Sequence, residues 1–266
     1  MSNVLSKGKA LVTGASMGIG AVYADRLARQ GYDLLLVARS KEKLLEVAQR
    51  IEDATGRRVE TLSADLIKLT DVRLVEDRLR SDSAITALVN NAGLASVETL
   101  LDSDPDYLDQ IIALNVTALT RLSLAAASSF VKRGSGLIIN IGSVVSLAPE
   151  RLNGTYSGSK AYVSNFSFAL KNELEGKGVR VQLVLPGATS TSIWERAGVP
   201  IHSLPAETVM TAEDVVDASL AGLDLGEFIT IPSLPDLEHF ETYERARLAL
   251  HPHLSRKHPA PRYSQR

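Results

Sequence analysis

A tyrosine and a lysine stand four positions apart, Tyr156 and Lys160, in the stretch NGTYSGSKAYV (153–163). On a helix, residues i and i+4 lie above one another on the same face. A free tyrosine has a pKa of about 10, and a cation about 4 Å away at an effective dielectric of about 20 contributes on the order of 4 kcal/mol. That energy lowers a pKa by roughly three units, toward the pH where a general acid and base works best. The pair therefore indicates proton transfer, although the same spacing also occurs in helices without a chemical role.

Three glycines near the amino terminus have the spacing G-x-x-x-G-x-G, in TGASMGIG (13–20). They follow an apolar run and precede a helical pattern. Glycine tolerates the positive φ of a tight turn and lets a ligand approach the backbone, and the helix start offers N–H groups and positive charge to a phosphate. The pattern indicates dinucleotide binding, with glycine as a plain turn residue the alternative.

The end of the second apolar run bears on which dinucleotide is bound. An NAD-selective protein places an acid there on the ribose 2′-hydroxyl, but this chain has Ala38, followed by Arg39 and Ser40. An arginine can bind a 2′-phosphate through two donors. We therefore expect NADP(H) in preference to NAD(H), although Met17 in the glycine turn adds no second positive charge.

Short apolar runs alternate with helical patterns along the chain, and the runs are apolar throughout, as in a parallel sheet buried on both faces. This alternation predicts a doubly wound α/β domain of Rossmann type with a seven-stranded parallel sheet and helices on both faces. Strands are expected at 9–15, 32–38, 58–64, 85–92, 136–143, 179–187 and 227–232. Helices are expected near 18–30, 41–54, 69–81, 104–132, 155–177 and 211–224.

Composition excludes several classes of function. The chain has no cysteine, which removes disulfides and thiol chemistry, and its net charge of −2 gives no electrostatic case for nucleic acid or an anionic membrane. The start of the chain lacks the pattern of a signal peptide, and no uninterrupted apolar stretch approaches the length of a membrane span. The three histidines of the tail are interrupted by prolines without a carboxylate. We therefore expect a soluble, cytoplasmic protein with no metal, no nucleic-acid partner and no membrane partner.

Taken together and in this order, TGASMGIG, NNAG (90–93), IGSVVS (141–146) ahead of YSGSK (156–160), and PGATST (186–191) resemble the short-chain dehydrogenase/reductase family. The resemblance covers about residues 8 to 232. It implies a catalytic tetrad of Asn, Ser, Tyr and Lys, which falls on Asn115, Ser143, Tyr156 and Lys160. Ser146 is the alternative for the serine, and a structural role is the alternative for Asn115.

The resemblance also implies which residues bind the cofactor. Asp65 is expected to hold the adenine amino group, or alternatively to cap the following segment. The wall beside the adenosine ribose and the turn at the nicotinamide carboxamide are expected from NNAG and PGATST. The full expected cofactor set is Gly14, Ser16, Met17, Gly18, Ile19, Gly20, Arg39, Ser40, Asp65, Leu66, Asn91, Ala92, Gly93, Tyr156, Lys160, Pro186, Gly187, Thr189 and Thr191.

The implied reaction is hydride transfer between NADP(H) and a ketone or aldehyde, or the reverse. Tyr156 moves the proton, Ser143 orients the oxygen, Lys160 lowers the tyrosine pKa and grips the nicotinamide ribose, and Asn115 holds a water in a relay. Alternatives are a non-catalytic NADP(H)-binding sensor or scaffold, a β-ketoacyl thioester reductase, and an epimerase or dehydratase of the longer sugar-nucleotide branch.

A mostly apolar segment at about 188–210 is expected to form the substrate lid. Leu147, Leu152 and Trp194 are the pocket candidates and indicate a hydrophobic, uncharged carbonyl substrate, whereas Arg151 would suit an anionic, carrier-linked one.

For the whole chain, we expect one domain over 1–250 and a basic, proline-bearing arm over 251–266. The long helices near 104–132 and 155–177 carry small and apolar residues beyond the needs of one sheet face. Because the resembled family commonly pairs such helices across subunits, a homodimer or homotetramer is expected.

Overall fold

A computed structural model describes residues 7–198 and 203–263. The chain divides into two compact units, Met1–Pro232 and Ser233–Arg266. The expected boundary between domain and arm lies after residue 250, whereas this division falls after Pro232.

The first unit is built on a seven-stranded sheet in the order β3-β2-β1-β4-β5-β6-β7, with every neighbouring pair parallel. The expected doubly wound fold is therefore confirmed. The strand order reverses between β1 and β4, which is where open α/β sheets bind ligands beyond the carboxyl ends of their strands. The strands are β1 Lys9–Thr13, β2 Asp33–Ala38, β3 Val59–Ser63, β4 Ile85–Asn90, β5 Gly136–Ile141, β6 Val179–Val184 and β7 Ile229–Thr230.

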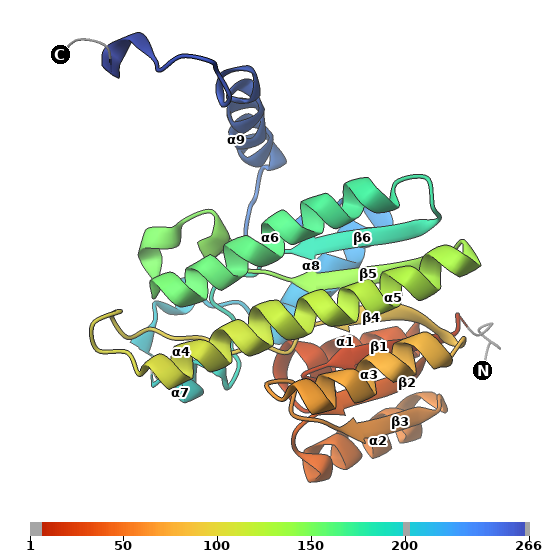
Figure 1. Ribbon diagram of the computed structural model, residues 1–266. Coiled ribbons are helices and arrows are strands. Elements are labelled where there is room, and N and C mark those ends of the chain that lie inside the picture. The colour runs from red at the N-terminus through yellow and green to blue at the C-terminus, as the bar shows by residue number, and fades with distance from the viewer. Residues whose placement is uncertain (1–6, 199–202, 264–266) are drawn as a thin grey trace. The chain divides into compact units, whose positions relative to one another are not determined.

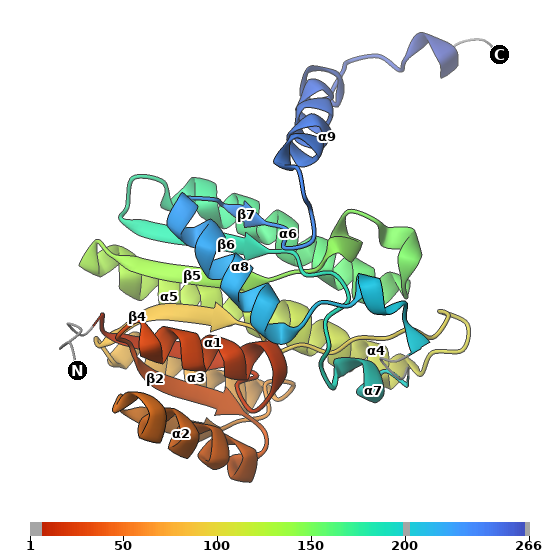
Figure 2. The same cartoon turned by 180° about the vertical axis from the view of Figure 1, so that it is seen from behind.

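Helices cover both faces of this sheet (Figures 1 and 2). On one face lie α1 (Gly18–Arg29), α2 (Lys41–Thr55) and α8 (Ala212–Leu225), whose buried residues form one apolar core with the sheet. On the other face, α3 (Leu69–Ser81), α5 (Leu119–Arg133) and α6 (Gly154–Leu174) form a second core. The strands need apolar side chains on both faces because both faces are covered.

The helix expected near 104–132 is continuous but not uniform. It starts as α4 (Pro105–Ile112), passes through a π-helical segment η1 (Ala113–Ala118), and continues as α5. π-Helical turns inside α-helices often occur at functional sites, and this one contains Asn115. Within the described residues, the run Pro105–Arg133 is long and apolar enough to cross a membrane by length and composition, with half of its most apolar window buried in the protein.

Short turns surround the carboxyl ends of the strands. They are η2 (Val144–Ser146), η3 (Pro149–Arg151), α7 (Ile193–Arg196) and η5 (Ala206–Thr208). An isolated parallel bridge joins Thr189 to Met210 and closes the base of the segment expected as the lid. Residues 199–202 of that segment lie outside the described residues.

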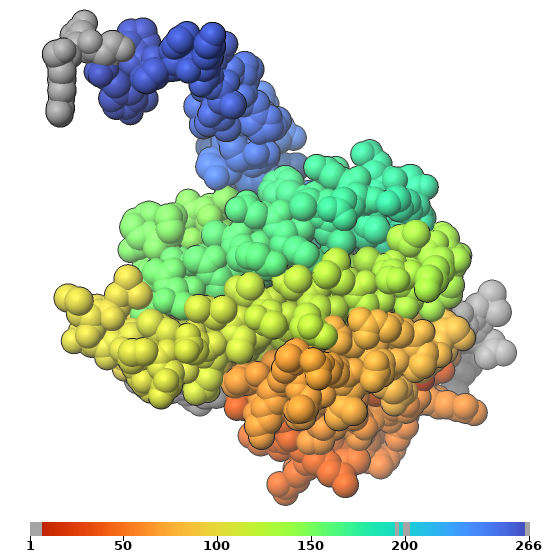
Figure 3. All heavy atoms as spheres, viewed as in Figure 1, coloured from red at the N-terminus to blue at the C-terminus, as the bar shows by residue number. Residues whose placement is uncertain are grey.

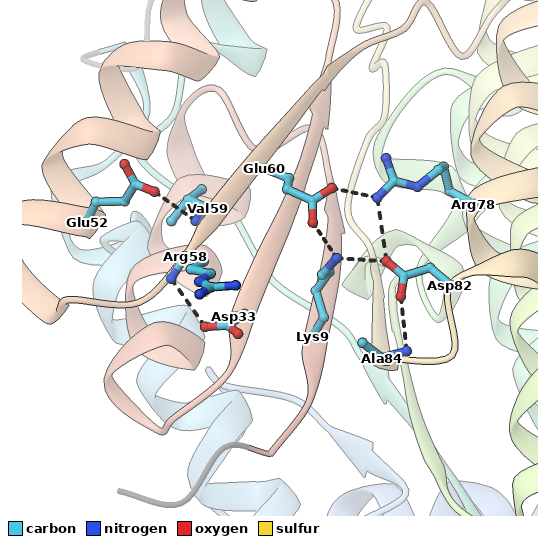
Figure 4. Close-up of polar contacts among 9 residues, drawn as sticks. All are labelled: Lys9, Asp33, Glu52, Arg58, Val59, Glu60, Arg78, Asp82 and Ala84. Atoms are coloured by element: carbon cyan, nitrogen blue, oxygen red, sulfur yellow. Dashed lines mark hydrogen bonds and ion pairs between the residues drawn. The ribbon is translucent and has the colours of Figure 1, made fainter. Parts of the chain in front are cut away.

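A charged cluster ties together the opposite, amino-terminal edge of the sheet (Figure 4). The Nζ of Lys9, on β1, contacts Glu60 of β3 and lies 2.7 Å from Asp82, which follows α3. Arg78 of α3 lies 2.6 Å from the other oxygen of Glu60. This cluster links three elements far from the carboxyl ends of the strands.

The second unit contains helix α9 (Leu237–Ala249), with short turns η6 (His251–His253) and η7 (Pro261–Tyr263) after it. Helix α9 was not among the elements expected from the sequence. None of its residues is buried. Charged and apolar residues are mixed around this helix, so its sequence lacks the periodicity of an amphipathic helix and did not predict it.

Candidate active site

A cavity of about 420 Å³ opens at the carboxyl ends of the strands, beside the reversal between β1 and β4. It is lined mainly by the loops that follow β1, β2, β3, β4, β5 and β6 and by the first two turns of α6. The expected residues that line it are Gly14, Ser16, Met17, Gly18, Ile19, Arg39, Ser40, Asp65, Leu66, Asn91, Ala92, Gly93, Ser143, Leu152, Tyr156, Lys160, Pro186, Gly187, Thr189, Thr191 and Trp194. Gly20, Asn115 and Leu147 do not line it.

The glycine turn after β1 has the geometry that its sequence indicates. Gly14 and Gly18 have φ angles of 65° and 54°, in the left-handed region that favours glycine. A Cβ on Gly14 would lie 2.8 Å from the side-chain nitrogen of Asn91, so that position cannot hold a larger residue. Gly20 is packed against Gly14 and Asn91 instead of facing the cavity.

Helix α1 starts directly at this turn without a side-chain cap on its first N–H groups. A helix start with free N–H donors and a close glycine backbone suits a pyrophosphate. The site therefore fits a dinucleotide on geometric grounds.

Thr13 joins the two strands at the reversal and was missed by the sequence analysis. Its hydroxyl accepts hydrogen bonds from the N–H groups of Asn91 and Ala92, both at 3.0 Å, and donates to the carbonyl of Val89. The side chain of Asn91 donates back to the Thr13 carbonyl at 3.0 Å. These hydrogen bonds hold the NNAG turn against the glycine turn.

The far end of the cavity carries two positive side chains. Arg39 follows β2, and Lys43 lies one turn into α2, which Ser40 caps by accepting from the Lys43 N–H at 3.3 Å. Within the described residues, neither side chain forms an ion pair with an acid. Lys43 is a second cation of the lining that was not expected from the sequence, because its place at the cavity depends on where α2 begins.

Asp65, in the loop after β3, also lines this end. One of its carboxylate oxygens accepts from the N–H of Ile67 at 3.3 Å, and its own N–H donates to Asp71 at 2.9 Å. Asp65 therefore shapes its own loop while it faces the cavity, so both expected roles are compatible with the structure.

Tyr156 lies in the first turn of α6 and is 8% exposed. Asn153 caps this helix: its side-chain oxygen accepts from the N–H groups of Thr155 and Tyr156, at 2.9 and 3.5 Å. The amide of Asn153 also donates to the carbonyl of Glu98 at 2.8 Å. Asn153 thus positions Tyr156, and an asparagine three residues before a helical tyrosine is the signal that could have revealed it.

The structure separates the two candidate serines. Ser143 lines the cavity at the start of η2, with its hydroxyl 3.4 Å from the Pro186 carbonyl. Ser146 turns its hydroxyl to the carbonyl of Ser143 at 2.8 Å and does not line the cavity. Ser143 is therefore the serine placed beside Tyr156.

Lys160 lies one turn after Tyr156 and is also buried. Its Nζ donates to the carbonyl of Ile141 at 3.0 Å and lies 6.0 Å from the centre of the Tyr156 ring. Burial lowers the pKa of Lys160 to about 8.

The pKa of Tyr156 does not shift as the sequence analysis expected. Burial raises it, and a hydrogen bond with Ser143 opposes that rise only in part. Desolvation of the phenolate outweighs this hydrogen bond. In the protein by itself, Tyr156 is therefore a proton donor at neutral pH.

Asn115 lies behind the cavity in the π-helical segment. Its side-chain oxygen accepts from the Leu94 N–H at 2.9 Å, while its amide donates to the Leu94 carbonyl at 2.9 Å and to the Ser159 hydroxyl at 3.0 Å. A Cβ on Gly93 would lie 3.3 Å from this oxygen and 3.7 Å from the Nζ of Lys160. Asn115 thus fixes the loop after β4 against α6, and its role in a water relay stays a prediction.

The remaining end of the cavity is apolar. Its lining includes Leu94, Val145, Leu152, Ile193 and Trp194, and the indole of Trp194 is held by a hydrogen bond to the Thr189 carbonyl at 2.9 Å. Leu147 follows η2 with 37% of its surface exposed and lies outside the lining, so it does not face the pocket as expected. Arg151, in η3, also lies outside it.

Known proteins share both the sequence and the architecture. The chain is 34% identical over 221 residues to human (Homo sapiens) 17-beta-hydroxysteroid dehydrogenase type 3, covering 82% of this chain and 68% of that protein. It is 40% identical over 181 residues to a very-long-chain 3-oxoacyl-CoA reductase of Coccidioides immitis, covering 66% of this chain and 52% of that protein.

Two solved structures match nearly the whole chain. A short-chain dehydrogenase from Sphingobium yanoikuyae in complex with NADPH is 45% identical, with a TM-score of 0.93 over 96% of this chain and 100% of that one. The bulky-bulky ketone specific alcohol dehydrogenase from Comamonas testosteroni is 40% identical, with a TM-score of 0.89 over 96% of this chain and 98% of that one.

The sequence model of the short chain dehydrogenase family matches residues 8–199. That span contains the glycine turn, the strand reversal and the Ser143–Tyr156–Lys160 group. The protein is therefore an oxidoreductase that belongs to the short-chain dehydrogenase family.

Proposed function

We propose that the protein is an NADPH-dependent reductase of ketones or aldehydes, able to run in the reverse direction. The observation that carries this proposal is one cavity with Ser143, Tyr156 and Lys160 in its wall and Arg39 and Lys43 at its far end. The first group suits proton transfer to a carbonyl oxygen, and the second suits a phosphate on a ribose.

The cofactor assignment rests on fit. The glycine turn and the uncapped start of α1 would hold the pyrophosphate, and Arg39 with Lys43 would hold the 2′-phosphate. Ala38 leaves no carboxylate to repel that phosphate. The similar protein from Sphingobium yanoikuyae is in complex with NADPH. When bound, NADPH supplies the hydride for the reaction.

The chain's own residues supply the proton and the orientation. The Tyr156 hydroxyl, protonated at neutral pH, donates to the carbonyl oxygen as negative charge develops on it. The Ser143 hydroxyl donates a second hydrogen bond to that oxygen. Lys160, held at the Ile141 carbonyl, stabilises the phenolate that Tyr156 leaves behind.

For the substrate, we propose an uncharged, hydrophobic carbonyl compound with sizeable groups on both sides. The lining around Leu152, Ile193 and Trp194 is apolar, and among the described side chains Lys160 is the only cation at this end. Arg151, which would suit an anionic substrate, lies outside the lining. The likeness to an alcohol dehydrogenase specific for bulky-bulky ketones supports this class.

A β-ketoacyl thioester reductase is the second candidate, favoured by the 40% identity to a very-long-chain 3-oxoacyl-CoA reductase. Its substrate would carry the reacting ketone on an apolar chain, which the same lining accepts. Direct competition between a bulky aryl ketone and a β-ketoacyl thioester decides between the two.

The test is substrate-dependent oxidation of NADPH, and separately of NADH, followed by the loss of nicotinamide absorbance. Tyr156→Phe is the chemical control, and Tyr162→Phe is the matched control because Tyr162 is exposed on the same helix. We expect Tyr156→Phe to lose about 10²–10⁴-fold in kcat, and Tyr162→Phe to keep wild-type turnover.

Trp194 is the single tryptophan and lines the cavity, so energy transfer from it to the reduced nicotinamide reports cofactor binding in each variant. Cofactor binding without turnover on a broad ketone, aldehyde and thioester panel would favour the sensor alternative. Undiminished turnover in Tyr156→Phe would overturn the proposed mechanism.

We also propose that the protein forms a homodimer or homotetramer through α5 and α6. These helices form a continuous outer surface on one face (Figure 3), and Leu124, Val131 and Tyr162 on it are partly exposed. Light scattering at several concentrations tests this, and a mass of one chain at all of them contradicts it.

A further inference from the structure

Trp194, in the short helix α7, differs in kind from the other apolar residues of the cavity wall. The apolar lining around it is aliphatic and includes Leu152 and Ile193. Among the described residues that line the cavity, the only other aromatic side chain is Tyr156, which the proposed reaction uses for the proton. Trp194 therefore gives the wall one aromatic surface that the proton transfer does not require.

The turn of chain that carries Trp194 lies beside the reacting group. Its neighbour Ile193 packs against a buried cluster formed by Ala95, Val145 and Tyr156, and Leu152 packs against the same cluster. Trp194 itself lines the cavity. A substrate whose carbonyl oxygen reaches the Tyr156 hydroxyl is thus within this apolar end, where Trp194 is part of the wall.

The indole of Trp194 is held in one orientation by its own loop. Its Nε1–H donates to the carbonyl of Thr189 at 2.9 Å. Thr189 is buried and pairs with Met210, whose carbonyl also accepts from the N–H of Ser190 at 2.8 Å. The single polar atom of the ring is thus already bonded within the protein, and a substrate that meets the ring meets only its apolar π surface.

A fixed aromatic surface distinguishes an aryl group from a saturated group of the same size. Both groups remove a similar apolar area from water, so the hydrophobic contribution is nearly the same for the two. The aryl group also gains from offset-stacked or edge-to-face contact with the indole. Because the hydrogen bond to Thr189 already fixes the indole, little side-chain freedom is lost when this contact forms.

We propose that Trp194 makes this site selective for ketones that carry an aromatic ring, over aliphatic ketones of the same size. This inference rests on the proposed function, because it assigns a specificity to the same site. It favours an aryl ketone over the alkyl chain of a β-ketoacyl thioester. Trp194 acts on the choice of substrate and takes no part in the proton transfer.

Two ketones with one skeleton test the selectivity. One carries a phenyl ring and the other a cyclohexyl ring, each joined to the carbonyl through two methylene groups, with a propyl group on the other side. The methylene groups give both carbonyls the same intrinsic reactivity. We expect kcat/KM of the wild type with NADPH to favour the phenyl ketone by about three- to tenfold.

Two substitutions then assign the preference to the ring. Trp194→Leu and Trp194→Phe both remove the hydrogen bond to Thr189, but only Trp194→Phe keeps an aromatic ring. We expect the phenyl-to-cyclohexyl ratio of kcat/KM to fall to about one in Trp194→Leu and to be largely kept in Trp194→Phe. The ratio does not depend on how much of a preparation is folded, so partial unfolding cannot imitate this result.

Leu152→Val is the matched control within the same lining. It shortens an aliphatic side chain, so it should change kcat/KM for both ketones by the same factor and leave their ratio as in the wild type. Calorimetric titration with NADPH completes the test, because we expect the dissociation constant of Trp194→Leu to equal that of the wild type.

Four results overturn the inference while the proposed function stands. They are a wild-type ratio near one, an unchanged ratio in Trp194→Leu, loss of the ratio in both Trp194 variants, and weaker NADPH binding in Trp194→Leu with equal losses for the two ketones. The third result would assign the selectivity to the hydrogen bond at Thr189, and the fourth would place the indole on the cofactor. Absence of NADPH-dependent turnover with every ketone would overturn the proposed function as well.

Discussion

Burial controls the ionisation of the two groups that would move the proton. It raises the pKa of Tyr156 and lowers that of Lys160 to about 8, because each charged form loses its hydration inside the protein. For reduction, this leaves the tyrosine protonated at neutral pH and the lysine charged below about pH 8. The pair therefore favours proton donation until a bound substrate develops charge.

The depressed pKa of Lys160 predicts how stability depends on pH. The unfolded chain, with a lysine pKa of about 10.4, binds more protons than the folded one between about pH 8 and that value, so stability rises with pH across this window. We expect the free energy of unfolding of the wild type to increase from pH 7 to pH 9 relative to Lys160→Met. Urea titrations at both pH values measure it, and the other groups cancel in the comparison. A constant difference between the two proteins would contradict a buried, titrating lysine.

If Lys43 contacts the 2′-phosphate, its removal should weaken the binding of NADPH but not of NADH. Lys43→Ala should weaken NADPH binding by about two- to fivefold, or roughly 0.5–1 kcal/mol, and leave NADH binding unchanged. The effect should shrink at high salt, because the side chain is exposed and screened. Energy transfer from Trp194 gives both dissociation constants. Lys41→Ala, an exposed lysine on the same turn outside the cavity lining, is the control. Equal losses for NADPH and NADH would exclude a contact with the 2′-phosphate.

At the scale of elements, the cavity depends on where α6 begins. Asn153 caps the helix at the turn that carries Tyr156 and also holds the loop at Glu98. The π-helical segment also fixes α6, because its Asn115 forms hydrogen bonds with both Leu94 and Ser159 of α6. Helix starts and irregular turns, more than the strands, set the positions of the reacting groups.

Loss of this cap should affect both stability and turnover. Asn153→Ala should cost about 1 kcal/mol of unfolding free energy and lower kcat more than it raises KM, since Tyr156 loses its fixed position. Asn153→Ser keeps a capping oxygen and should restore most of both. Denaturant unfolding and steady-state kinetics measure the two effects. A change in KM alone would mean that Asn153 shapes the substrate pocket instead of placing Tyr156.

At the scale of the whole molecule, the cluster of ion pairs on the sheet lies away from the candidate active site. The cluster of Lys9, Glu60, Arg78 and Asp82 lies at the amino edge of the sheet, whereas the cavity lies at the carboxyl ends. Lys9 holds the pKa of Glu60 below its usual value, mainly through their hydrogen bond. Changes in this cluster should therefore alter stability and leave catalysis unaffected.

Lys9→Met tests this separation. It leaves Glu60 and Asp82 with Arg78 as their remaining cation, and we expect a loss of about 1 kcal/mol in unfolding free energy with kcat and KM unchanged. A carboxyl whose pKa is lowered by folding stabilises the protein above its unfolded pKa and loses that contribution as the pH falls. The difference between wild type and variant should thus narrow toward acidic pH in urea titrations. A fall in kcat at full folding would show that the two edges of the sheet are coupled.

The sequence by itself determined the seven strands, their parallel arrangement, the family and most of the expected residues that line the cavity. These follow from local signals: apolar runs of fixed length, glycines whose conformation no other residue adopts, and the Tyr–Lys spacing on one helix face. These features can be predicted from the sequence because each signal depends on residues within a few positions of one another along the chain.

Only the tertiary structure decided the rest. It showed that Ser143 and not Ser146 faces Tyr156, that Lys43 joins Arg39, that Leu147 points away, and that Thr13 and Asn153 hold the site together. It reversed the expected shift of the Tyr156 pKa and revealed α9. In each case the outcome depends on burial and on contacts between segments far apart in the chain. A local sequence pattern does not show how the cost of desolvation compares with the electrostatic attraction in such places.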